Sequence, residues 1–278
     1  MSHVATAHRG RRATDAANLE VIERGVCTPA HPVPLLFVHG AYHGAWCWHE
    51  HFLNFFTCKG YRALAVSLRG HGKSPTLKPI RRCSWADYVD DVRAVADGLP
   101  TRPVLIGHSL GGYVVQRYLE SFPAPAGVLV ASIPPRGVLG VLLRLTKRHP
   151  LLMATATITG KSLSCVNTPE RAREYFFSAE APESHVARYA AWLQEESQRA
   201  CMDALLFGLP RPRRVTTPML VLGAEDDRCV STREVRATAR AYRTEANIFP
   251  GMGHDMMLEP DWPAVAEQIH TWLEGREL

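Results

Sequence analysis

The chain has 278 residues, of which 46% are hydrophobic and 21% are charged, and its formal net charge is +5. These values lie near the average of globular proteins and leave room for a sizeable core, so we expect one main domain. The basic residues are scattered and form no platform with aromatic residues, which argues against nucleic-acid binding. No apolar run approaches the length that crosses a bilayer, so we expect no stable membrane insertion.

Cysteine usage bears on the compartment and on metal binding. The chain has 7 cysteines, widely separated and without the paired spacing typical of metal ligands. An odd number of scattered cysteines favours reduced thiols over a disulfide framework. We therefore expect a cytoplasmic protein with no metal site.

Residues 1–20 are predicted to form a flexible N-terminal arm. Residues 1–14 are rich in histidine, arginine and alanine, and they lack the apolar core of a secretory signal. An amphipathic targeting segment is the alternative, although Asp15 and Glu20 follow soon after the basic residues.

Beyond the arm, short apolar runs alternate with helix-like segments. Runs typical of buried strands occupy 35–38, 63–68, 104–106, 127–131 and 219–222. Helix-like segments occupy 46–59, 85–98, 113–122, 232–241 and 262–274. This alternation predicts a mainly parallel sheet with helices on both faces. Ligands of such a sheet bind at the carboxyl ends of its strands.

The pattern changes between residues 132 and 212. This stretch has no clear strand and contains apolar or amphipathic helical pieces, among them 138–149 and 183–207. We interpret 132–212 as a helical lid, or cap, inserted into a core that is formed by 21–131 and 213–278.

The most informative motif is Gly-His-Ser-Leu-Gly at 107–111, which follows an apolar strand and precedes a helix. A serine at a sharp strand-to-helix turn needs small residues two positions before and after it, and Gly107 and Gly111 supply them. The turn exposes the Ser109 hydroxyl and directs the Leu110 amide toward the same space, where a helix start leaves donors free. Ser109 is therefore predicted as a nucleophile and Leu110 as one donor of an oxyanion hole.

A serine nucleophile needs a base and an acid, which occur here in the chain order serine, acid, histidine. His254 lies in a glycine-rich loop after a strand-like piece at 246–250. Its imidazole would accept the serine proton, and a carboxylate would hold the correct tautomer. The apolar strand at 219–222 runs into three carboxylates that compete for the acid role: Glu225, Asp226 and Asp227.

Together these motifs resemble the α/β-hydrolase superfamily over nearly the whole chain, from about Leu35 to Leu273. The His39-Gly40 pair at a strand end and the segment 69–74 after the next strand add to the resemblance. It implies the α/β-hydrolase fold, with a mainly parallel sheet, flanking helices and a lid inserted before the acid. It also implies a Ser-His-Asp triad and Ala41 as the second oxyanion donor.

The resemblance also bears on the choice of acid. In this superfamily the acid commonly precedes one residue, then two apolar positions and a proline or small residue, which fits Asp227 before Arg-Cys-Val-Ser. Counting forward from Gly223 favours Asp226 instead. We choose Asp227 and keep Asp226 as the alternative, while Glu225 fits least well.

The loop at 39–48 more narrowly resembles that of plant methylesterases and hydroxynitrile lyases. Those lyases carry threonine where this chain has Gly40, and lysine after the catalytic histidine where this chain has Asp255. Both departures favour hydrolysis over cyanohydrin cleavage. Tyr42 and His43 are candidates for the substrate pocket. His108 is a third candidate, although it and His39 are more typical of supports that bond to the backbone.

We therefore predict a cofactor-independent serine hydrolase that cleaves a carboxylic ester or lactone with an apolar moiety through an acyl-enzyme. A thioesterase, an acyltransferase or a carbon–carbon bond hydrolase would use the same triad and is the alternative. A catalytically silent receptor for a small ligand is an alternative of another class. The sequence is compatible with either a monomer or a homodimer.

Overall fold

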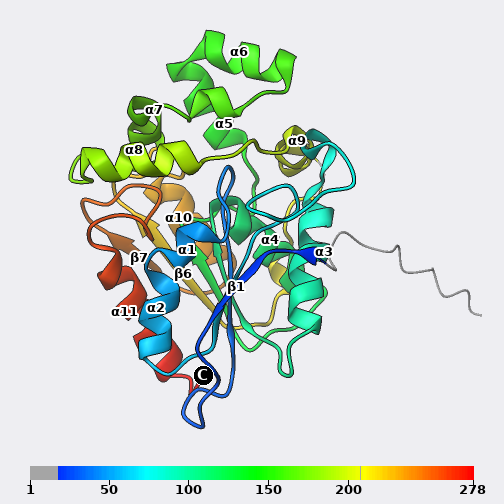
Figure 1. Ribbon diagram of the computed structural model, residues 1–278, viewed down its shortest axis with the longest axis vertical. Helices are drawn as coiled ribbons and strands as arrows, with labels where there is room; N and C mark the ends of the chain where they lie inside the picture. Colours follow the sequence, from blue (N-terminus) through cyan, green and yellow to red (C-terminus); the bar gives the residue numbers. More distant parts are fainter. Residues whose placement is uncertain (1–17, 207) are drawn as a thin grey trace, which may run out of the picture.

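The computed structural model describes residues 18–206 and 208–278, and these form an α/β structure around one sheet (Figure 1). The sheet has the strand order β1-β3-β2-β4-β5-β6-β7. β1 runs antiparallel to β3, and every other neighbouring pair is parallel. The predicted mainly parallel sheet flanked by helices is confirmed.

The strands are short, and the central ones are buried on both sides. Their bounds are β1 (Val21–Arg24), β2 (Leu35–Val38), β3 (Ala63–Val66), β4 (Val104–His108), β5 (Gly127–Val130), β6 (Met219–Ala224) and β7 (Ala246–Phe249). Every residue of β2 to β6 is buried, because helices cover both faces of the sheet. This burial explains why their sequences are nearly continuous apolar runs.

Helices form a layer on each face of the sheet. α2 (Phe52–Cys58) and α11 (Trp262–Glu274) pack together on one face, and α3 (Trp85–Asp97) and α4 (Ser109–Leu119) lie on the other (Figure 1). α10 (Thr232–Ala241) packs against β6 and β7. α3 and α10 each begin with a capping box, in which a serine and an acidic residue satisfy backbone donors of the first turn.

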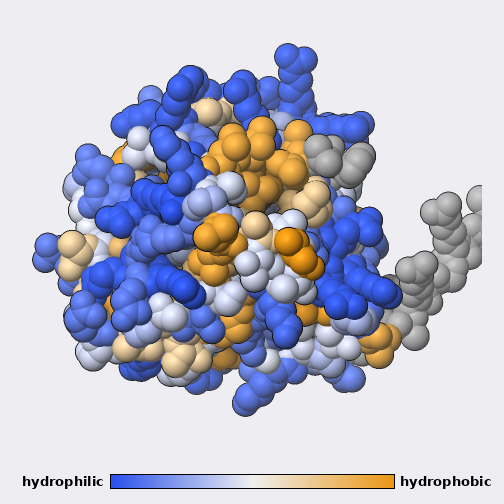
Figure 2. All heavy atoms as spheres, turned by 90° about the horizontal axis from the view of Figure 1, so that it is seen from above, coloured by the Kyte–Doolittle hydropathy of each residue, from blue (hydrophilic) through white to orange (hydrophobic). Residues whose placement is uncertain are grey.

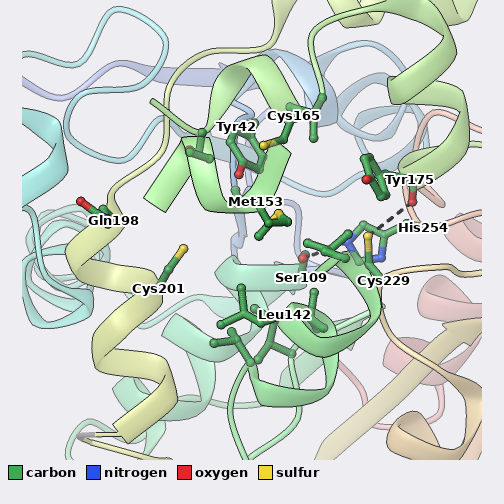
Figure 3. A pocket seen from close by; sticks show the side chains of 18 of the residues that line it. Tyr42, Ser109, Leu142, Met153, Cys165, Tyr175, Gln198, Cys201, Cys229 and His254 are labelled. Carbon is green, nitrogen blue, oxygen red and sulfur yellow. Dashed lines mark hydrogen bonds between the residues drawn. The ribbon is translucent and has the colours of Figure 1, made fainter. Parts of the chain in front are cut away.

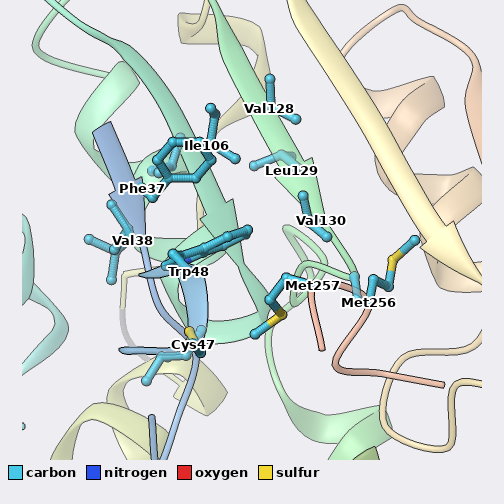
Figure 4. Packing of buried hydrophobic residues seen from close by; sticks show 14 of the residues in the cluster. Phe37, Val38, Cys47, Trp48, Ile106, Val128, Leu129, Val130, Met256 and Met257 are labelled. Atoms are coloured by element: carbon cyan, nitrogen blue, oxygen red, sulfur yellow. The ribbon is translucent and has the colours of Figure 1, made fainter. Parts of the chain in front are cut away.

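The core extends from the centre of the sheet to the loop that carries His254. Trp48 of α1 (Trp46–His49) packs against Phe37 of β2, with their ring centroids 5.0 Å apart. Met256 and Met257 are fully buried, and Figure 4 shows them beside Leu129 and Val130 of β5. The residues just after His254 are therefore anchored in the core.

Among the described residues, five α-helices separate β5 from β6 and lie over the carboxyl ends of the parallel strands (Figure 1). They are α5 (Leu139–Arg148), α6 (Pro150–Thr159), α7 (Pro169–Phe176), α8 (Glu183–Trp192) and α9 (Gln198–Leu206). As expected, the described part of this insertion contains no strand. Within the part of the chain that the structure describes, no helix is long and apolar enough to span a membrane.

Four local features correct or qualify what the sequence predicted. The helix expected at 46–59 is two helices, α1 and α2, and the helix expected at 183–207 is α8 and α9 separated by five residues. β1 was not expected, because two of its four residues are exposed, the other two are only partly buried, and four residues are too few to show a period. Of the predicted arm, residues 1–17 lie outside the described residues, and Glu20 accepts a hydrogen bond from Ser67 Oγ at 2.6 Å.

Candidate active site

Ser109 lies at the turn between β4 and α4, in the left-handed backbone region, with φ of 50°. The two glycines of its motif allow this turn because the chain passes very close to them. A Cβ at Gly107 would lie 2.6 Å from the Gly111 carbonyl oxygen, and a Cβ at Gly111 would lie 2.3 Å from that of His39. Any larger residue at either glycine would push the strand and the helix apart.

The turn brings Ser109 into a chain of two hydrogen bonds. Ser109 Oγ lies 2.9 Å from Nε2 of His254, and His254 Nδ1 lies 2.7 Å from Oδ2 of Asp227. A carboxylate can only accept, so Nδ1 carries the hydrogen and Nε2 is left with a lone pair toward the hydroxyl. This is the arrangement in which an imidazole can accept the serine proton.

The structure distinguishes between the candidate carboxylates. The second oxygen of Asp227 accepts hydrogen bonds from the backbone amides of Cys229 and Val230, at 2.7 and 2.8 Å, which fixes the carboxylate toward His254. Asp226 and Glu225 are exposed, and neither is hydrogen bonded to His254. Among the three sequence candidates, Asp227 is the one that meets the histidine.

The protonation of His254 reflects its buried surroundings. Burial alone would lower the pKa of His254, but the charge of Asp227, its hydrogen bond and the charge of Asp255 outweigh burial and raise the pKa above its usual value. An imidazolium formed during proton transfer is thereby stabilised.

The loop after β2 lies directly against the serine. A Cβ at Gly40 would lie 3.0 Å from Ser109 Cβ. The Gly40 carbonyl accepts hydrogen bonds from His39 Nδ1 at 2.8 Å and from the His43 amide at 3.4 Å. Because a trans peptide is planar, holding this carbonyl also holds the Ala41 N–H, which points the opposite way. Neither the Ala41 nor the Leu110 amide donates to another described residue.

His39 and His108 act as neutral supports for the two loops. His39 also accepts the Leu68 amide at 3.0 Å, and burial holds its pKa well below the usual value. His108 Nε2 donates to the His254 carbonyl at 3.0 Å. Burial and the nearby His254 lower the pKa of His108 to about 3, so this ring is uncharged.

A cavity of about 210 Å³ opens beside the serine (Figure 3). All three predicted pocket residues border it: Tyr42, His43 and His108. Most of the lining is apolar and comes from the helical insertion, including Leu142 and Leu145 of α5, Met153 of α6 and Phe176 of α7. Cys165, Cys201 and Cys229 add three thiols. A ligand in this cavity would have an apolar part next to the Ser109 hydroxyl.

Two residues near His254 had no assigned role in the sequence motifs. Glu259 accepts hydrogen bonds from the amides of Gly253 and Ser178, at 3.0 and 2.6 Å, and so fixes the histidine loop against the insertion. Asp255 forms a buried ion pair with His43, at 2.9 Å. The position of Asp255 directly after His254 is the one signal of its importance that the sequence offers.

Two sets of donors near the triad have atoms within 4.8 Å of one another: His108, His254 and Asp255, and Asp227, Cys229 and His254. Both sets contain His254, whose Nδ1 already donates to Asp227 and whose Nε2 faces Ser109. A metal ion would have to displace the hydrogen bonds that orient the triad. The donor sets are therefore explained by the triad itself.

Residues 35–268 match the model of the alpha/beta hydrolase family, and the chain belongs to this family. It is 26% identical to a monoacylglycerol lipase of Mycolicibacterium smegmatis, over 86% of this chain and 87% of the relative. It is 28% identical to a non-heme chloroperoxidase of Burkholderia pyrrocinia, over 82% and 87% of the two chains.

Two further similarities concern plant methylesterases and the fold. Over 34% of this chain and 36% of the relative, the sequence is 34% identical to methylesterase 18 of Arabidopsis thaliana, which confirms the resemblance to plant methylesterases. A solved structure of a thermophilic esterase from Thermogutta terrifontis superposes with a TM-score of 0.73 at 18% identity, covering 94% of each chain. At this identity the likeness supports the fold alone.

Proposed function

We propose that this chain is a serine hydrolase that cleaves a carboxylic ester or lactone with an apolar moiety through an acyl-enzyme. The broader class, carboxylic ester hydrolase, follows from the family and from relatives named as a lipase and a methylesterase. The observation that carries the finer proposal is the chain of hydrogen bonds Ser109–His254–Asp227 at the edge of an apolar cavity.

The proposed reaction has two halves. Ser109 Oγ attacks the ester carbonyl while His254 Nε2 takes its proton, and the amides of Ala41 and Leu110 stabilise the oxyanion. His254 then gives the proton to the leaving alcohol, which departs and leaves the acyl group on Ser109. Water then attacks that ester while His254 takes its proton, and His254 returns the proton to Ser109 Oγ as the acid is released. Asp227 orients His254 and stabilises its imidazolium throughout.

The insertion supports the expected kind of substrate. We propose that residues 132–212 act as a lid, because this insertion, with α5, α6 and α7 among its helices, contributes most of the apolar wall of the cavity. A volume of about 210 Å³ is small compared with the roughly 300–1,000 Å³ of most ligand pockets. We therefore expect short or medium acyl groups to fit better than long ones.

The direct test is turnover of p-nitrophenyl esters, from acetate to decanoate, by the wild type and by Ser109→Ala. We expect release of nitrophenolate with an optimum at short or medium acyl length. The substitution should lower kcat by at least about 10⁴-fold, because the nucleophile is lost. Ser121→Ala, at an exposed serine after α4, is the matched control and should keep wild-type activity.

Active-site labelling gives an independent readout. A fluorophosphonate should add to the wild type at Ser109 and should not add to Ser109→Ala. If folded wild-type protein neither hydrolyses any ester of the series nor forms the adduct, the hydrolase proposal is wrong, and a silent ligand-binding role takes its place.

A further inference from the structure

A buried ion pair beside the triad is not used by the reaction proposed above. His43 Nε2 lies 2.9 Å from Asp255 Oδ2, and the two side chains are 1% and 0% exposed. Removing two charges from water costs several kcal/mol per ion unless their partners compensate for it. The pair joins segments that are 212 positions apart in the sequence, so it fixes one loop of the site to another.

His43 uses both of its ring nitrogens. Nδ1 donates to the Ala41 carbonyl at 2.7 Å, while Nε2 faces the Asp255 carboxylate. Both neighbours are acceptors, so the ring satisfies them together only when both nitrogens carry hydrogen. Burial would raise the pKa of Asp255, but the charge and hydrogen bond of His43 lower it overall, so the carboxylate is ionised.

The contacts of His43 hold the loop that carries the proposed oxyanion donor. Its amide donates to the Gly40 carbonyl, and its ring donates to the Ala41 carbonyl, so both peptide groups that flank the Ala41 Cα are held. Tyr42, the residue between Ala41 and His43, has a φ of 68°, in a region that residues other than glycine seldom adopt. Such strain persists where the surrounding contacts impose it.

Asp255 is fixed from the other side. Its amide donates to the Phe176 carbonyl at the end of α7, at 2.9 Å. Its Oδ1 atom has no hydrogen-bond partner among the described residues and lies 3.7 Å from His108 Nε2. The negative charge therefore remains close to the triad, where it helps to raise the pKa of His254. The titratable groups that face Asp255 are His43, His108, His254, Cys47, Cys229 and Glu259.

We propose that His43 and Asp255 are a positioning pair that holds the Ala41 amide in the oxyanion hole and supports His254 electrostatically. This inference rests on the proposed function. An oxyanion donor must lie about 2.7–3.1 Å from the developing charge, and a displaced donor loses much of its effect. The pair provides this accuracy by fixing the donor loop directly to the residue that follows the base.

The test compares Asp255→Asn, His43→Asn and His43→Leu with the wild type on a p-nitrophenyl ester. Asp255→Asn should lower kcat by about 10–100-fold with KM changed less than about threefold, because the donor shifts while the cavity remains. The acid limb of kcat/KM should also move to lower pH, because a negative charge near His254 is lost. His43→Asn can still donate to the Ala41 carbonyl and should retain more activity than His43→Leu.

The controls separate this inference from a simple loss of folding. Rates are expressed per active site, and the active sites are counted by titration with a fluorophosphonate. Asp226→Asn, at an exposed neighbour of the proposed triad acid, should keep the wild-type kcat. In Asp255→Asn/His43→Asn the losses should not multiply, since both act through one contact. The inference would be overturned if the two losses multiplied, or if folded Asp255→Asn had the wild-type kcat and pH profile. In either case, Ser109-dependent turnover by the wild type would leave the hydrolase proposal intact.

Discussion

Ser109 is held in a left-handed backbone conformation, with φ of 50°, that costs a residue with a side chain on the order of 1–3 kcal/mol. The surrounding structure maintains it because β4 and α4 are packed closely at Gly107 and Gly111. The consequence is chemical: the hydroxyl leaves the sheet and lies 2.9 Å from His254 Nε2. Backbone strain at this residue thus serves to bring the proposed nucleophile to its base.

Asp227 provides a prediction at the scale of one residue. Asp227→Asn removes the charge that orients His254, and we expect kcat to fall by roughly 10³–10⁴-fold. Asp226→Asn is the matched control and should have little effect, because Asp226 is exposed and does not touch the histidine. Ester turnover by the two purified variants checks this. Equal losses in both, or a loss in Asp226→Asn alone, would reverse the assignment of the acid.

The pH dependence gives a second residue-scale prediction. The base must be neutral, and the pKa of His254 is raised, so kcat/KM should fall as the pH drops through a value above the usual 6.5 or so. In Asp227→Asn the charge that raises this pKa is absent and burial prevails, so the acid limb should move to lower pH. Rate profiles of both proteins between about pH 5 and 9 measure the two limbs. A wild-type limb well below pH 6 contradicts this assignment of charge around His254.

At the scale of elements, the sequence predicts the strands and helices that depend on local sequence pattern, and it misses the features that depend on contacts with distant residues. The strands β2 to β6 were predictable because burial on both faces requires apolar runs. The break between α8 and α9 was not, because distant partners cause it: the Gln194 amide donates to the Tyr42 carbonyl, and Glu196 pairs with His71. No glycine or proline marks these five residues.

The site follows the same rule. Ser109 and His254 were predictable because each sits in a glycine-rich motif next to a strand. The sequence left the choice of the triad acid open between Asp226 and Asp227. In the structure, two backbone amides hold the Asp227 carboxylate toward His254. The His43–Asp255 pair was not predictable, since two common residue types 212 positions apart carry no local signal. The sequence therefore indicated the candidate catalytic residues, but it did not indicate the contacts that hold them in place.

Helix α6 has apolar residues on two faces, and these should behave differently. Met153 points into the cavity near Ser109 in Figure 3, whereas Leu151 is 83% exposed. Figure 2 shows apolar surface on the face seen from above, where the insertion lies. Met153→Ala should enlarge the cavity and shift the preferred ester to a longer acyl chain. Leu151→Ala, the control on the outer face, should leave that preference unchanged, since Leu151 does not line the cavity.

Acyl-chain profiles with p-nitrophenyl esters decide this prediction. The comparison is of kcat/KM for each chain length, normalised to the best substrate of each variant. A profile unchanged in Met153→Ala, or shifted equally by Leu151→Ala, would mean that α6 does not form the acyl wall.

At the scale of the whole molecule, the insertion is joined to the core by a buried network below α8 and α9. His71, from the loop after β3, lies 3.3 Å from Glu196, and the side chains are 0% and 1% exposed. Tyr88 of α3 donates to Glu196 at 2.8 Å, and Gln194 accepts the Gly72 amide at 2.5 Å. These contacts attach the link between α8 and α9 to the core.

The His71–Glu196 pair should make stability depend on pH in a defined way. Burial lowers the pKa of His71, but Glu196 raises it overall, and burial raises the pKa of Glu196, but His71 lowers it overall. A raised histidine pKa contributes stability that is complete below the unfolded value, about 6.5, and is lost as pH rises through the folded value. A lowered glutamate pKa contributes stability above about 4.3 that is lost as pH falls through its folded value.

Glu196→Gln therefore tests how the insertion is held. Both contributions coexist between about pH 4.3 and 6.5, so the loss of unfolding free energy in this variant should be largest there, about 3–5 kcal/mol for an uncompensated buried partner. It should shrink as the pH rises further, because His71 becomes neutral. Urea unfolding of the wild type and of Glu196→Gln at several pH values measures the difference, with exposed Glu180→Gln as the control. If the difference in unfolding free energy did not depend on pH, His71 and Glu196 would contribute through packing contacts and not through their charges.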